Sequence, residues 1–83
     1  MNKNLIIAKL ERLNVLLEEK IEEADNSIVY WEGRIEKSGE NEIVGDATCK
    51  DCLNTAIENK EHFEKEIKEN EALIKELREE AQE

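Results

Sequence analysis

Two long stripes of apolar residues, separated by one break, constrain this chain more than any other feature of its sequence. In residues 4–38 an apolar side chain recurs every three or four positions, close to the 3.6-residue period of a straight α-helix. The chain contains no proline and is rich in charged residues, a composition typical of long helices or coiled coils. The residues expected to face inward from this first helix are Ile6, Leu10, Leu13, Leu17, Ile21, Ala24, Ile28, Trp31 and Ile35.

The second stripe predicts a helix over residues 48–81, with spacings that alternate between four and three, the heptad pattern of a coiled coil. Two polar residues, Lys60 and Asn70, interrupt its apolar series. Polar residues at such positions either fix the register of the helices or lie at an edge and reach solvent, and the sequence leaves both interpretations open. The whole stripe consists of Cys49, Leu53, Ala56, Lys60, Phe63, Ile67, Asn70, Ile74, Leu77 and Ala81.

Residues 39–47 form the break between the two stripes and contain the residues that end helices. Gly39 and Gly45 disfavour helical structure, and Thr48 followed by Asp51 predicts an N-cap with a variant of the capping box. Because the connection is short, the second helix must return antiparallel to the first. The sequence therefore predicts one all-α domain, residues 1–83, folded as an antiparallel, coiled-coil-like hairpin of two helices.

Further apolar residues lie off the main stripes, near the end of the hairpin where the chain termini meet. An apolar face wider than one neighbouring helix can cover predicts self-association. A homodimeric four-helix bundle is the simplest closure, because two-fold dimers are the commonest oligomers. The residues assigned to the dimer interface are Leu5, Ile7, Val15, Leu16 and Leu73.

Net charge limits the classes of partner that the chain can bind. The chain has 22 acidic and 12 basic residues, for a net charge of −10. Contacts with phosphates or anionic lipids need clustered Lys and Arg, so we expect no direct binding to nucleic acid or to a membrane. The densest acidic run is either a solvated face or a docking face for a protein with a basic surface. Its candidate partner-binding residues are Glu18, Glu19, Glu22, Glu23 and Asp25.

The turn and the sole histidine offer few further candidates for functional residues. Ile43 and Val44 are apolar residues in a polar turn, and they either plug the end of the hairpin or contact a partner. His62, the sole histidine, is expected at the surface. The chain has no Gly-rich phosphate loop and no Ser-His-Asp set, so we expect no enzymatic activity.

Both cysteines of the chain, Cys49 and Cys52, form a CxxC motif beside the turn. The motif resembles the apex of the zinc-hook ATPases of DNA-break repair, in which two antiparallel coiled-coil hairpins share one zinc ion. The resemblance implies zinc ligation by these two residues. A structural zinc takes four ligands, which gives one ion per two chains, and the positive end of the helix favours the thiolate form. Packing as small apolar residues and a local disulfide remain alternatives.

A small acidic protein-binding module without a cofactor is the function that the sequence favours. We expect a homodimeric adaptor or inhibitor that acts on a protein partner with a basic surface. A zinc-bridged dimerisation module is the alternative, and a dithiol redox protein is a third hypothesis. No secretory signal or bilayer-spanning run is visible, so a cytoplasmic location is expected. The excess of Lys over Arg and the many Asn residues suggest a bacterial or phage genome.

Overall fold

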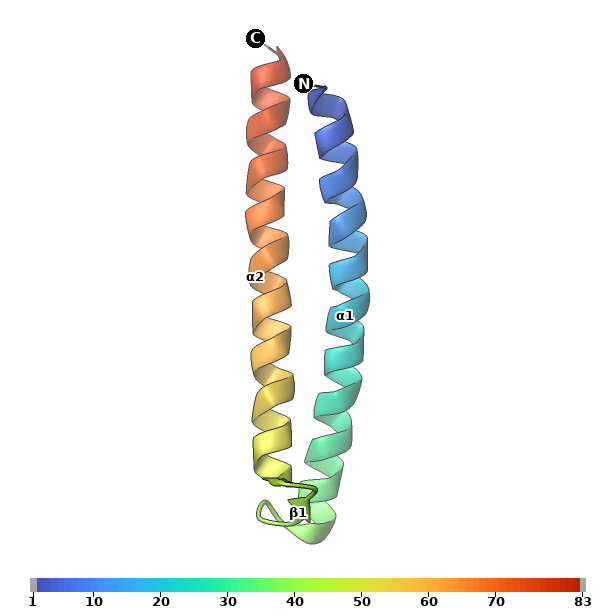
Figure 1. The fold of residues 1–83 in the computed structure, drawn as a ribbon, viewed down its shortest axis with the longest axis vertical. Helices are drawn as coiled ribbons and strands as arrows, with labels where there is room; N and C mark the ends of the chain where they lie inside the picture. Colours follow the sequence, from blue (N-terminus) through green and yellow to red (C-terminus); the bar gives the residue numbers. More distant parts are fainter. Residues whose placement is uncertain (1, 83) are drawn as a thin grey trace.

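Two long helices lie side by side and form a hairpin (Figure 1). The computed structural model describes the backbone of residues 2–82 and the side chains of residues 2–80. Helix α1 spans Lys3–Ser38 and helix α2 spans Cys49–Gln82. They run antiparallel in a rod of 59 × 20 × 14 Å, with both termini at one end and the connection at the other. The predicted all-α hairpin is confirmed, and each helix boundary lies within one residue of its predicted position.

Side-chain caps define where both helices begin. The side-chain oxygen of Asn2 accepts hydrogen bonds from the backbone N–H groups of Asn4 and Leu5, at 3.0 and 3.3 Å. At the start of α2, the Asp51 N–H donates to the Thr48 hydroxyl at 3.1 Å, and the Thr48 N–H donates to the Asp51 carboxylate at 3.2 Å. This reciprocal pair confirms the predicted capping box.

The connection between the helices contains a small β-hairpin that the sequence analysis did not predict. Strands β1 (Ile43–Val44) and β2 (Ala47–Thr48) pair antiparallel, with Ile43 opposite Thr48 and Val44 opposite Ala47. Gly45 opens the two-residue loop with a φ of 69°, a position where tight hairpin turns favour glycine. Strands of two residues are too short to show an alternating pattern, which is why sequence periodicity missed them.

The helices meet along one seam in which both follow a heptad repeat. On α2 the predicted stripe is confirmed for every member except Ala81, which lies outside the described side chains. On α1 the seam also alternates spacings of three and four, because a polar residue, Asn14, occupies one of its positions. The buried or half-buried seam residues of α1 are Ile7, Leu10, Asn14, Leu17, Ile21, Ala24, Ile28, Trp31 and Ile35.

Two sequence-based predictions for residues near the start of α1 were wrong. Ile7 was assigned to the dimer interface, but it is 7% exposed and packs into the seam of its own hairpin. Leu13 was expected inside, but it is 44% exposed. The error has one cause: a purely apolar stripe begins at Ile6 and includes Leu13, whereas the true seam begins at Ile7 and passes through Asn14. The dimer itself stays a prediction.

Candidate functional site

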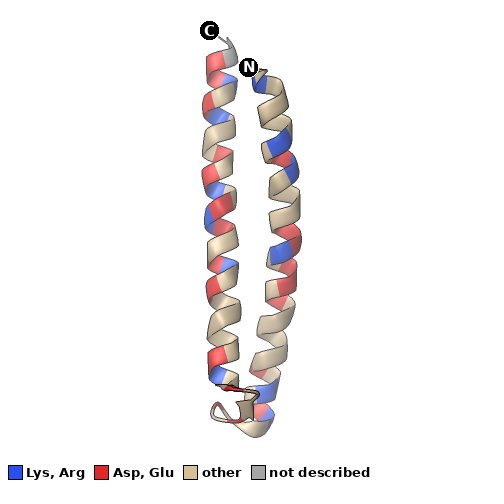
Figure 2. Cartoon of the chain, viewed as in Figure 1, with Lys and Arg blue, Asp and Glu red and all other residues tan. Residues whose placement is uncertain are grey.

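Positions beside the seam divide the hairpin surface into two opposite sides. The heptad repeat places residues seven apart on the same side of a helix. We name one side the acidic side, after Glu11 and Glu18 of α1 and Glu64 and Glu71 of α2. The other is the leucine side, named after Leu13, Leu16 and Leu73. Figure 2 shows acidic and basic residues along both helices.

The acidic side is hollowed by two adjoining grooves of about 430 and 300 Å³. Glu18 and Glu71 line both grooves, which makes them continuous along the hairpin. The apolar residues in their lining are Val15, Ile21, Ile67 and Ile74. The basic residues Lys68, Lys75 and Arg78 all come from α2, and Arg78 pairs with Glu11 at 3.4 Å. The α1 wall is therefore the more negative of the two.

The structure separates the five residues of the predicted acidic run. Glu18 lines the grooves of the acidic side, and Glu22, one turn later, lies on the same side. Glu19 lies on the outer edge of α1, away from α2. Glu23 lies on the leucine side, where its carboxylate is 3.5 Å from the Lys20 ammonium. The run is therefore not one docking face, although part of it belongs to the acidic grooves.

Asp25, the last residue of the run, contacts a polar seam residue instead. The ammonium of the half-buried Lys60 lies 2.7 Å from the Asp25 carboxylate, and this hydrogen bond raises the pKa of Lys60. Lys60 thus crosses from α2 to α1 at the edge of the seam. The two polar seam residues of α2 therefore behave differently. Lys60 reaches the edge of the seam, whereas the side chain of Asn70 forms a hydrogen bond with Asn14 within the seam.

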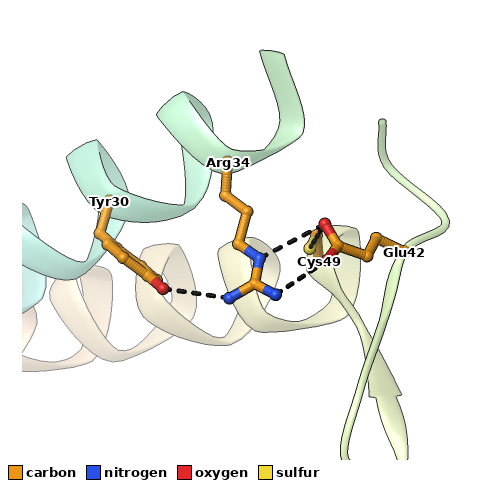
Figure 3. Close-up of polar contacts among 4 residues, drawn as sticks. All are labelled: Tyr30, Arg34, Glu42 and Cys49. Carbon is orange, nitrogen blue, oxygen red and sulfur yellow. Dashed lines mark hydrogen bonds and ion pairs between the residues drawn. The ribbon is translucent and has the colours of Figure 1, made fainter. Parts of the chain in front are cut away.

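Four side chains form a polar network at the turn (Figure 3). Arg34 donates two hydrogen bonds to the Glu42 carboxylate, at 2.8 and 3.3 Å, and a third to the Tyr30 hydroxyl at 3.1 Å. The bonds to Glu42 raise the pKa of Arg34 above its ordinary value, and the bond from Arg34 is the main cause that lowers the pKa of Glu42. The backbone carbonyl of Glu42 also accepts the Cys49 N–H at 2.9 Å. The network thus holds the turn against both helices.

Cys49 and Cys52 occupy different environments. Cys49 is 0% exposed, and its Sγ lies 3.8 Å from Oε2 of Glu42. Burial and the Glu42 carboxylate raise the pKa of the Cys49 thiol, so the expectation of a favoured thiolate was wrong for this residue. Cys52 is half-buried and lines a groove of the leucine side. Both thiols are free, and the described residues contain no cluster of three His, Cys, Asp or Glu suited to a metal ion.

Ile43 and Val44 also differ in their surroundings. Val44 is half-buried, which fits a plug at the end of the hairpin, whereas Ile43 is largely exposed at the tip. The sequence offered no basis for predicting the Arg34–Glu42 pair beyond two opposite charges on either side of a glycine. No helix in the described part of the chain is long and apolar enough to cross a lipid bilayer.

The leucine side carries apolar residues in two places, near the termini and nearer the tip. Leu13, Leu16 and Leu73 are exposed near the termini. Nearer the tip, a groove of about 520 Å³ is lined in part by Trp31, Phe63 and Cys52.

The residues predicted for the dimer interface do not all share this side. Leu16 and Leu73 lie on it, but Val15 lines an acidic groove and Leu5 lies on the outer edge of α1. The apolar surface available to a second chain is therefore narrower than the sequence analysis assigned.

Comparison with known proteins does not assign the chain to a family. No family model, no curated protein and no solved structure matches it significantly. Its function is therefore inferred from the geometry of the two sides.

Proposed function

We propose that this protein is a small acidic binding module, an adaptor or inhibitor, that docks a basic segment of a partner protein on its acidic side. The observation that carries the proposal is the continuous pair of grooves on that side. Rows of carboxylates from both helices flank an apolar lining, a combination that suits a ligand with both positive charge and apolar side chains.

An amphipathic helix with Lys or Arg beside its apolar face is the ligand class that this surface fits. Its apolar residues would cover Val15, Ile21 and Ile67, and its basic residues would lie nearest Glu11 and Glu18. The reason is the asymmetry of the grooves, since their basic residues all belong to α2. Charge at such a surface mainly speeds association and selects among partners.

A matched pair of variants tests the docking side. Glu18→Gln/Glu22→Gln removes two charges from the acidic side, whereas Glu19→Gln/Glu23→Gln removes two charges from the same run of α1 but from other sides. The full-length chain, immobilised, would capture its partner from a lysate, and the purified partner would then be titrated with each variant. We expect about tenfold weaker binding for the first variant at low salt and little change for the second.

The result that would reject the proposed docking side is equal binding by both variants. Binding that is insensitive to salt would reject the charge-based mechanism as well, because exposed charges are screened beyond about 10 Å at 0.1 M salt. The proposal also includes a homodimer, which would present two acidic sides and so suits an adaptor.

A further inference from the structure

The leucine side carries opposite charges on its two halves. The α1 half contributes Lys9 and Lys20, and the α2 half contributes Glu66 and Glu76. Lys20 lines the groove of this side, and Lys9 lies three helical turns before it. Glu66 lies two turns after Asn59, which lines the same groove. Within the described chain Glu23 is the exception on the α1 half, and it pairs with Lys20.

The Asn14–Asn70 hydrogen bond sets the heights of these residues along the rod. Residues of α1 and α2 at the same height have numbers that add to 84, as these two do. Lys9 is therefore one residue, about 1.5 Å of helical rise, from the height of Glu76. Lys20 and Glu66 are offset by two residues, about 3 Å, and so are Leu13 and Leu73. Lys9, Lys20 and Leu13 of α1 thus each have a complementary residue of α2 near their own height.

We propose that the leucine side binds the leucine side of a second copy of this chain, around a two-fold axis parallel to the long axis of the hairpin. Such an axis keeps every residue at its own height and places α1 of one copy against α2 of the other. Lys9 then faces Glu76 of the second copy, Lys20 faces Glu66, and Leu13 packs against Leu73. All neighbouring helices of the resulting four-helix bundle are antiparallel.

The alternative two-fold arrangement is opposed by the same charges. An axis perpendicular to the hairpin and centred on the leucines would place α1 against α1 and α2 against α2. Lys9 would then face Lys20 of the second copy, and Glu66 would lie three residues, about 4.5 Å of helical rise, from the height of Glu76 of the second copy, so both contacts would be repulsive. The parallel axis also overlaps the two hairpins along the whole 59 Å of the rod, whereas an axis centred on the leucines, near one end, overlaps only part of it.

Charge reversal in the full chain tests the pairing, with dissociation constants measured by analytical ultracentrifugation at low salt. Lys9→Glu and Glu76→Lys should each weaken the dimer about tenfold, because each replaces two attractive contacts per dimer by repulsive ones. The double variant Lys9→Glu/Glu76→Lys should recover to within about threefold of the wild type, because it restores both contacts with their signs exchanged. Lys75→Glu is the matched control, since it makes the same charge change on the acidic side.

Three outcomes would overturn this arrangement. The wild-type chain could be monomeric at millimolar concentration, the double variant could fail to regain dimer affinity, or Lys75→Glu could weaken the dimer as much as Lys9→Glu does. Carbodiimide cross-linking of mixed isotope-labelled and unlabelled chains gives a second readout. We expect Lys9 joined to Glu76 between differently labelled chains, whereas interchain links confined to α1 with α1 would reject the parallel axis. This inference rests on the homodimer of the proposed function and specifies its interface. Both tests use the purified protein alone, so their results do not depend on whether a partner protein is found.

Discussion

The side-chain amide of Asn70 donates a hydrogen bond to the amide oxygen of Asn14, 3.0 Å away across the seam between the helices. The two residues are 56 positions apart in sequence, and both occupy heptad positions that otherwise hold mostly apolar side chains. Sliding one helix along the other would leave both half-buried amides without partners. The pair therefore selects one register for the whole hairpin, at some cost in stability relative to an apolar pair.

Replacing one of the two asparagines should destabilise the hairpin more than replacing both. Asn14→Leu leaves the amide of Asn70 without its partner, which costs about 1–3 kcal/mol, whereas Asn14→Leu/Asn70→Leu removes both polar groups and should be neutral or stabilising. Urea unfolding of the two single variants and the double variant measures this difference. Equal free energies of unfolding for the single and double variants would mean that the bond does not select the register.

Leu13 and Leu17 should respond differently to the same substitution. Leu17 is 6% exposed, so Leu17→Asp buries an unpaired charge and should unfold the hairpin at a cost of several kcal/mol. Leu13 is 44% exposed on the leucine side, so Leu13→Asp should leave the chain helical but weaken the dimer. Circular dichroism reports the helix content and sedimentation reports the oligomer. Loss of helix in Leu13→Asp at concentrations where the wild-type chain is monomeric would contradict the observed seam.

The Arg34–Glu42 pair should make the turn sensitive to acid. The hydrogen bonds from Arg34 lower the pKa of Glu42 in the folded chain, so this carboxylate stabilises the fold above the ordinary Glu pKa of about 4.3. That contribution is lost as the pH falls through the lowered pKa of the folded state. Glu42→Gln should flatten this part of the profile of stability against pH. If the free energy of unfolding of Glu42→Gln fell with decreasing pH as steeply as that of the wild type, the pair would not link protonation to folding.

Cys49 should be protected from thiol reagents at neutral pH. Its burial keeps the reagent away, and its raised pKa disfavours the reactive thiolate. The thiol form stabilises the fold below the ordinary Cys pKa of about 8.5, and this stability is lost as the pH rises toward the higher pKa of the folded state. At a concentration where the chain is monomeric, mass spectrometry after brief alkylation should find Cys52 modified well before Cys49. Equal rates would mean that the turn opens readily.

The zinc-bridged alternative predicts one zinc ion per two chains and an oligomer that a chelator dissociates. Binding through both thiols would require Cys49 to leave the site where Glu42 and the seam bury it. We therefore expect the oligomer to be unaffected by a chelator and by Cys49→Ser/Cys52→Ser. Elemental analysis of freshly purified protein together with sedimentation of the double variant checks this. Stoichiometric zinc that is lost with the cysteines would instead support the metal-bridged module.

The sequence by itself determined the features that depend on neighbouring residues along the chain. Both helix lengths, the heptad stripe of α2 and the Thr48–Asp51 capping box could be predicted, because periodicity and capping act within a few residues. The start of the α1 seam could not be predicted. The stripe with Leu13 and the stripe with Ile7 overlap in the sequence, and the choice between them depends on which one meets α2. Only the paired structure made Asn14 a seam residue, since its partner lies on the other helix.

The tertiary structure alone also decided how the candidate surfaces are divided. The acidic run winds around α1, so its residues reach different sides once one stripe of the helix is covered by α2. The same packing buried Cys49 beneath the turn, where burial and then contact with Glu42 raise its pKa against the effect of the helix N-terminus. The burial of a residue, and the side of the hairpin on which it lies, arise from the pairing of segments far apart in sequence. The local pattern could therefore indicate which residues carry charge or a thiol, but not which surface presents them.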